Sequence, residues 1–188
     1  MLRTSAPLIG ALGIGRQAML DSSILLLTHA QLSIAVAGFS SVAAAIRRPL
    51  TPLLRQRFLA LLSVSFQQVL ACVLPVWLSG FIVDQDQIWQ TCSIITLLLY
   101  CAHTLWLVVL PMRKLGRPIG QVINPFVTAA TWLASIAAIT IIAINAIGYP
   151  GGSSFHMYYA GNAIWLFIGF MIFADVATTE SDRFEPDA

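Results

Sequence analysis

A long apolar stretch near the start of the chain, Ile24 to Ile46, contains no charged side chain and reads ILLLTHAQLSIAVAGFSSVAAAI. As a helix it would span roughly 34 Å at about 1.5 Å per residue, which is enough to cross the hydrocarbon layer of a bilayer, about 30 Å thick. The stretch therefore predicts a transmembrane helix. The rest of the chain has to fold around a segment that lies in lipid.

The composition of the whole chain agrees with this interpretation. Hydrophobic residues make up 58% of the 188 residues and charged residues only 10%, which leaves too few charged side chains to cover a soluble domain of this size. We therefore predict an all-α integral membrane protein in contact with the lipid bilayer. The net charge of +2 comes from basic loops that membrane topology explains, so nucleic acid is not an expected partner.

Further apolar stretches, separated by proline, glycine or charged residues, predict more membrane helices. The five expected spans are Ile24–Ile46, Phe58–Phe81, Ile88–Leu110, Val122–Ile147 and Phe155–Val176. Residues 1–21 are expected to form an interfacial segment, residues 22–176 a five-helix transmembrane domain, and residues 177–188 an acidic, disordered tail. Residues 1–21 also show the basic-then-apolar order of a signal peptide, so cleavage is the alternative to retention.

The positions of the basic residues predict the orientation, because loops rich in Lys and Arg stay in the cytoplasm. Two loops hold most of these residues: Arg47, Arg48, Arg55 and Arg57 in the first, and Arg113, Lys114 and Arg117 in the third. We therefore expect the N terminus outside and the C terminus in the cytoplasm. Asp175 then ends the last span at the height of the first basic loop, where Arg47 and Arg48 end the first span, so we expect it to lie within reach of a basic residue.

One face of the first span is lined by small and weakly polar residues. Stepping by four along the helix, this stripe contains His29, Ser33, Ala37, Ser41 and Ala45, with Gly38 beside it. Side chains this small let a neighbouring backbone approach closely, which matters in lipid because no hydrophobic effect drives helices together there. We expect the stripe to pack against another helix along most of its length.

Six polar side chains share one expected height in the second, third and fourth spans. They are Gln67, Gln68, Tyr100, His103, Thr131 and Ser135. A lone amide or imidazole is costly in hydrocarbon, so we expect these side chains to face one another or water. Two interpretations follow: a structural layer of hydrogen bonds that fixes helix register, or a polar constriction that lines a pore or binding pocket.

A second polar level is expected nearer the outside. It contains His29, Ser93, His156, Tyr158 and Asn162. Two histidines at one level could hold a metal ion or haem, since imidazole is a common ligand, but no carboxylate accompanies them. We therefore expect hydrogen-bonded histidines, with no metal and no cofactor. The three cysteines lack a Cys-x-x-Cys pair and are expected to serve packing.

The residues AGFSSVAAA, Ala37 to Ala45, resemble part of the opening helix of small bacterial multi-pass membrane proteins that have an A-G-F-containing first helix and no assigned function. The resemblance covers only the first span. It implies a bacterial inner (plasma) membrane protein and adds no mechanism.

The absence of charge inside the spans narrows the function. No Asp, Glu, Lys or Arg falls within any expected span, although ion-coupled transporters and proton pumps usually need one at membrane depth. No catalytic motif is present either, so we do not expect an enzyme. Two hypotheses remain: a homo-oligomeric passive channel or small-solute conduit, or an accessory or scaffold subunit of a larger membrane complex.

Overall fold

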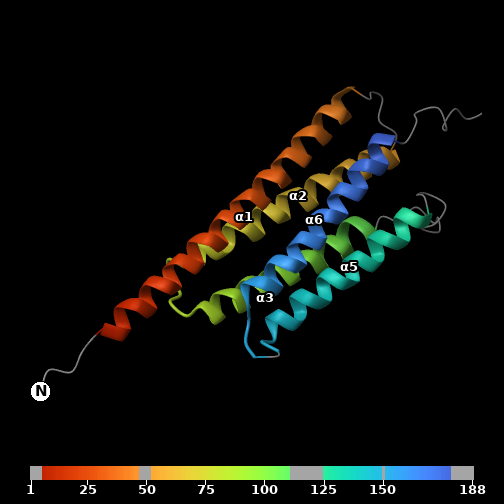
Figure 1. Cartoon of the computed structure of the whole chain (residues 1–188). Helices are drawn as coiled ribbons and strands as arrows, with labels where there is room; N and C mark the ends of the chain where they lie inside the picture. Colours follow the sequence, from red (N-terminus) through yellow and green to blue (C-terminus); the bar gives the residue numbers. More distant parts are fainter. Residues whose placement is uncertain (1–5, 47–51, 111–124, 150, 179–188) are drawn as a thin grey trace, which may run out of the picture.

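The computed structural model describes residues 6–46, 52–110, 125–149 and 151–178. In these ranges the chain forms α1 (Ala6–Ile46), α2 (Pro52–Leu78), α3 (Gln85–His103), the π-helix η1 (Thr104–Val109), α5 (Pro125–Ala146) and α6 (Phe155–Thr178) (Figure 1). Five segments are long and apolar enough to cross a membrane: Ser22–Ala43, Arg57–Leu78, Gln85–Trp106, Phe126–Ala146 and Phe155–Asp175. The predicted all-helical bundle with five helices of spanning length is therefore confirmed.

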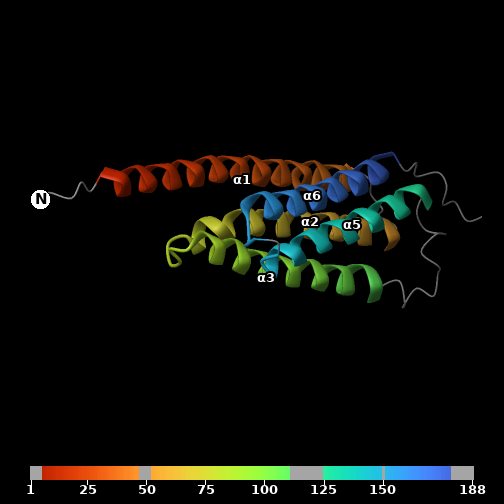
Figure 2. The ribbon, with the colours of Figure 1, turned by 60° about the horizontal axis from the view of Figure 1, so that its bottom comes forward.

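The first helix is longer than the span expected from the sequence. α1 begins at Ala6 and continues through Asp21 into the first span without a break. In Figures 1 and 2 it is a long rod whose N-terminal part extends past the ends of the other helices. The segment expected at the membrane interface therefore shares the axis of the first span from Ala6 onward. Residues 1–5 and the tail from residue 179 lie outside the described residues.

The third span changes its helical type near its end, which the sequence did not predict. α3 ends at His103, and the chain continues as a π-helix in which the backbone N–H of Leu110 donates to the carbonyl of Leu105. This bond reaches back five residues instead of the four of an α-helix, so the turn is wider. The wide turn follows His103 directly, at a position where the side chain already contacts α2 and α6.

The helices form three layers. α2 and α6 lie in the middle, α1 packs on one side of them, and α3 and α5 pack on the other (Figure 2). α5 and α6 approach closely because Gly161 has no side chain: a Cβ there would lie 2.5 Å from Cγ1 of Ile142. Such close contact between backbones is how small residues hold membrane helices together.

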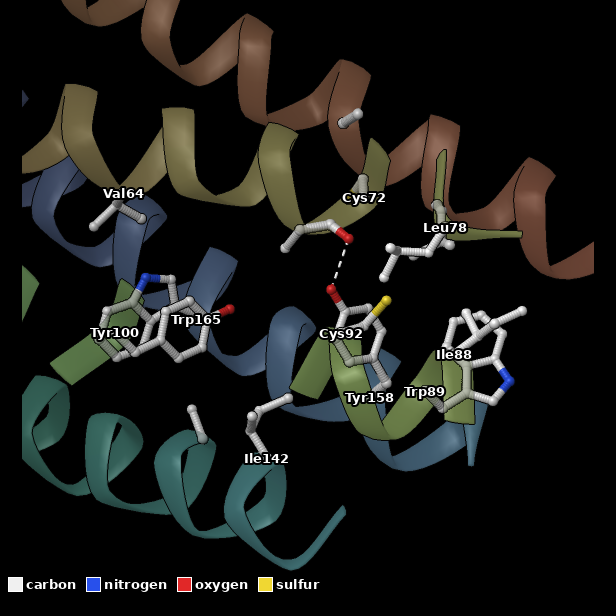
Figure 3. Packing of buried hydrophobic residues seen from close by; sticks show 14 of the residues in the cluster. Val64, Cys72, Leu78, Ile88, Trp89, Cys92, Tyr100, Ile142, Tyr158 and Trp165 are labelled. Atoms are coloured by element: carbon white, nitrogen blue, oxygen red, sulfur yellow. Dashed lines mark hydrogen bonds between the residues drawn. The ribbon is translucent and has the colours of Figure 1, made fainter. Parts of the chain in front are cut away.

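The core of the bundle is made by aromatic, aliphatic and cysteine side chains between α2, α3, α5 and α6 (Figure 3). Trp165, Tyr100 and Tyr158 are its largest fully buried side chains. The rings of Tyr100 and Trp165 stack with centroids 3.9 Å apart and planes 8° apart. Cys72 and Cys92 are buried in the same cluster as free thiols, as the packing role expected of them requires.

An ion pair joins α2 and α6 at one end of their spans. Nη1 of Arg57 lies 2.9 Å from Oδ2 of Asp175, and the two side chains are only 11% and 15% exposed. Asp175 therefore reaches the basic segment of residues 47–57, as expected. Its partner is Arg57, which lies in the first turns of α2; Arg47 and Arg48 lie outside the described residues.

We predict that Arg57→Leu lowers the melting temperature of the detergent-solubilised protein clearly more than Arg55→Leu. A solvated ion pair contributes about 0–1 kcal/mol, whereas a nearly buried carboxylate that loses its arginine costs several kcal/mol. Arg55 is exposed on the same helix and removes the same charge, so it is the matched control. Equal shifts for the two variants would show that the pair contributes no more than surface charge.

Candidate functional site

A chain of four polar side chains crosses the middle of the bundle, one from each of α1, α2, α3 and α6. Nε2 of His29 lies 2.7 Å from Oε1 of Gln68, Nε2 of Gln68 lies 2.8 Å from the Tyr100 hydroxyl, and that hydroxyl lies 2.7 Å from Oδ1 of Asn162. All four side chains are buried. We call this set of residues the central chain.

The hydrogen bonds of the central chain all run in one direction. Because the amide oxygen of Gln68 can only accept, His29 donates through Nε2; Gln68 then donates to Tyr100 and Tyr100 to Asn162. Asn162 passes its own amide hydrogen to the backbone carbonyl of Tyr158 at 2.8 Å. Each group thus uses its donor and its acceptor, an arrangement in which neighbouring bonds strengthen one another.

A second junction surrounds the hydroxyl of Tyr158. It donates to the carbonyl of Ala71 at 2.7 Å, shown as the dashed line in Figure 3, and therefore accepts from the Thr96 hydroxyl at 3.1 Å. These bonds join α6 to α2 and α3. They lie next to the central chain, because Asn162 donates to the carbonyl of the same tyrosine.

A third cluster closes the end of the bundle where α5 turns into α6. The Asn145 amide donates to the Ser93 hydroxyl at 2.8 Å and to the Ser154 carbonyl at 3.1 Å, and its oxygen accepts from the Ser154 N–H at 2.7 Å. The turn between them holds Gly148, Gly151 and Gly152 at positive φ, which glycine adopts without strain. Asn145 thus ties α5, α3 and the turn together.

The six side chains expected to line a pore or pocket divide into two groups. Gln68 and Tyr100 bond to each other, Gln67 donates to the carbonyl of Leu99 at 3.1 Å, and Nδ1 of His103 lies 3.0 Å from the Ser63 hydroxyl. These four thus contact the helix opposite, between α2 and α3. The oxygen of Gln67 is buried without a hydrogen-bond partner among the described residues.

Thr131 and Ser135 do not join the other four. The Thr131 hydroxyl donates to the carbonyls of Val127 and Thr128, and the Ser135 hydroxyl to the carbonyl of Thr131. A serine or threonine on a membrane helix can satisfy its hydroxyl on its own preceding turn, and so needs no partner helix. A shared height therefore did not bring them into the polar layer.

The stripe expected on α1 is buried at one end only. His29 and Ser33 are buried and Ala37 is half-buried, whereas Gly38, Ser41 and Ala45 are exposed. A row of steps of four drifts by about 40° per step on a helix of 3.6 residues per turn, so it leaves the contact with α2 and α6. The buried face instead consists of Leu26, His29, Ala30, Ser33, Val36 and Ser40.

The two polar levels expected from the sequence are one connected network. His29 and Asn162, assigned to the outer level, bond directly to Gln68 and Tyr100 of the inner one. His156 is exposed and stays outside this network. Sequence reasoning missed Ser63 and Asn145; an asparagine just before the glycine-rich turn was the available signal for Asn145.

No metal cluster forms in the described part of the chain: nowhere do three His, Cys, Asp or Glu side chains come together. The two inward histidines have an amide and a hydroxyl as partners. Comparisons with protein-family models, with curated proteins and with solved structures find no match to this chain. What the arrangement can do follows from its geometry: it holds five helices in a fixed register.

We predict that Gln68→Leu lowers thermal stability about twice as much as Gln67→Leu. Gln68 makes two interhelical side-chain bonds and Gln67 makes one, each worth about 0.6–1 kcal/mol in membrane proteins. The adjacent glutamines give matched variants, and melting in detergent followed by intrinsic fluorescence measures both. A larger loss for Gln67→Leu would contradict the central chain as the main lock.

Proposed function

We propose that the protein is an accessory or scaffold subunit of a larger membrane complex, without conduction or catalysis of its own. The observation that carries this proposal is that the central chain faces inward and is hydrogen-bonded along its length. A pore or binding site needs polar groups that face water or ligand. Here the candidate groups are used to hold helices together.

The large exposed apolar surface also supports a protein that works through contacts with lipid and other chains. Large hydrophobic side chains are exposed along every spanning helix, including Phe39, Phe66, Leu98, Leu133 and Phe167. The absence of charge in the middle of the spans supports the same proposal, because no group there could carry an ion or a proton across. The proposed location is the bacterial inner membrane.

We predict that the purified protein in proteoliposomes gives no water or small-solute flux above that of protein-free liposomes. A passive conduit lined by the polar layer would instead give flux that changes on Gln68→Leu. Stopped-flow light scattering with urea and glycerol distinguishes the two, and Gln67→Leu is the control for non-specific leakage. In parallel, particles extracted from the native membrane should have a mass beyond whole multiples of 20.4 kDa, because they contain other subunits.

The proposed orientation has the N terminus outside and the C terminus in the cytoplasm. The two ends of the bundle can be distinguished chemically: Arg57 and Asp175 mark one end, and the α5–α6 turn with Asn145 marks the other. By the positive-inside rule, the end with the basic residues is cytoplasmic.

We predict that a cysteine at Tyr149 in intact cells reacts with a charged, impermeant thiol reagent, whereas a cysteine at Arg55 reacts only after lysis. Both native side chains are exposed and lie at opposite ends of the bundle. The background chain carries Cys101→Ala, because Cys101 is exposed while Cys72 and Cys92 are buried. The reverse labelling pattern would invert the topology.

A further inference from the structure

Gln31 is an amide near the middle of the first span with no partner inside the chain. Its side chain is exposed, and no hydrogen bond joins it to another residue in the described ranges. It lies within about 3 Å of the midpoint of Ser22–Ala43 at 1.5 Å per residue. An unpaired amide at this depth faces hydrocarbon, where neither water nor a polar lipid headgroup can satisfy it.

The other amides that lie deeper than the first turn of a described span all have partners. They are Gln67, Gln68, Gln90, Asn145 and Asn162. The exposed hydroxyls of Thr28 and Ser41 on α1 donate to their own preceding turn, a solution that hydroxyls have in a helix. The amide of Gln31 therefore requires a partner from outside the chain.

The surroundings of Gln31 suit a second helix. The residues on its face of α1 follow spacings of three and four, the pattern of a left-handed helix pair, and all are exposed: Thr28, Gln31, Ala35, Gly38, Val42 and Ala45. This outward face lies opposite the buried face that contains Leu26 and Ser33. Gly38 has open space around it, with nothing within 4 Å of an added Cβ, so another backbone can approach closely there.

We propose that this outward face of α1 is a homodimer interface, in which the Gln31 amides of two copies hydrogen-bond to each other in the middle of the membrane. This inference rests on the proposed scaffold function and names one partner that the scaffold holds. Two copies of one chain share the same membrane orientation, so a two-fold axis relating them runs along the membrane normal. Each residue on α1 then meets its own copy at the same height.

This symmetry favours the second copy as the partner of Gln31. An amide carries a donor and an acceptor, so two of them satisfy each other, with Nε2–H of one copy donating to Oε1 of the other. The rest of the face is uncharged and small, so no like charges meet when it packs on itself. A different partner would have to bring a polar group of its own to this depth.

Two measurements on the full-length protein test the interface. In lipid vesicles, Förster transfer between labelled copies gives the dimer dissociation constant, which we expect Gln31→Leu to raise about 3- to 30-fold. In chains carrying Cys101→Ala, oxidation should cross-link Ala35→Cys to its copy, while the exposed neighbour Leu32→Cys, about 100° away from Gln31 around the helix, should stay monomeric.

Three outcomes would overturn the interface. They are unchanged affinity in Gln31→Leu, equal cross-linking of both cysteine variants, and wild-type chains that remain monomeric at high protein-to-lipid ratio but join a larger complex in native membranes. The last outcome would assign the face to a different subunit and leave the scaffold function standing. Flux through proteoliposomes that is sensitive to Gln68→Leu would instead overturn the scaffold function, so the two failures are distinguishable.

Discussion

The structure depends on the requirement that polar groups inside a bilayer find partners within protein, and Gln68 is the residue that meets it for most of the bundle. Its amide accepts from His29 on α1 and donates to Tyr100 on α3, which donates to Asn162 on α6. In lipid the helices gain little by hiding apolar side chains from one another, because lipid tails are equally apolar. A few directional bonds and close backbone contacts therefore decide which helices pair and in which rotation. The stack of Tyr100 on Trp165 uses the same tyrosine, so its ring and hydroxyl are positioned together.

The number of spans and the convergence of polar residues between α2 and α3 could be predicted from sequence, and the individual partners could not. Length and apolar composition suffice to predict spans because a bilayer sets a minimum length. Height along a helix, however, says nothing about direction around it or about the reach of a side chain. His29 and Asn162 were assigned to a separate level because the heights counted from the helix ends ignore how far glutamine and tyrosine side chains extend. Thr131 has the right height but bonds to its own helix.

The two faces of α1 show why the pattern of small residues was insufficient. A row stepping by four starts on the buried face at His29 and ends on the exposed side at Ala45, because each step overshoots a full turn by about 40°. Alternating steps of three and four keep to one side. The buried face follows such steps through Ser33 and Val36 to Ser40, and so does the exposed face through Gln31. Both faces carry small residues, so burial by α2 and α6 separates them and composition does not.

The ends of the bundle are closed by different chemistry, and this limits what the protein can do. At one end Arg57 and Asp175 keep their charges together at the edge of the spans; at the other, Asn145 is held by neutral hydrogen bonds to Ser93 and Ser154. Between them lie neutral, paired groups without a carboxylate, lysine or arginine. Moving an ion or proton through such an interior would mean breaking the bonds that hold the helices in register. The groups still available for function are therefore those on the outside of the bundle, and a protein of this design acts by what its helix faces hold.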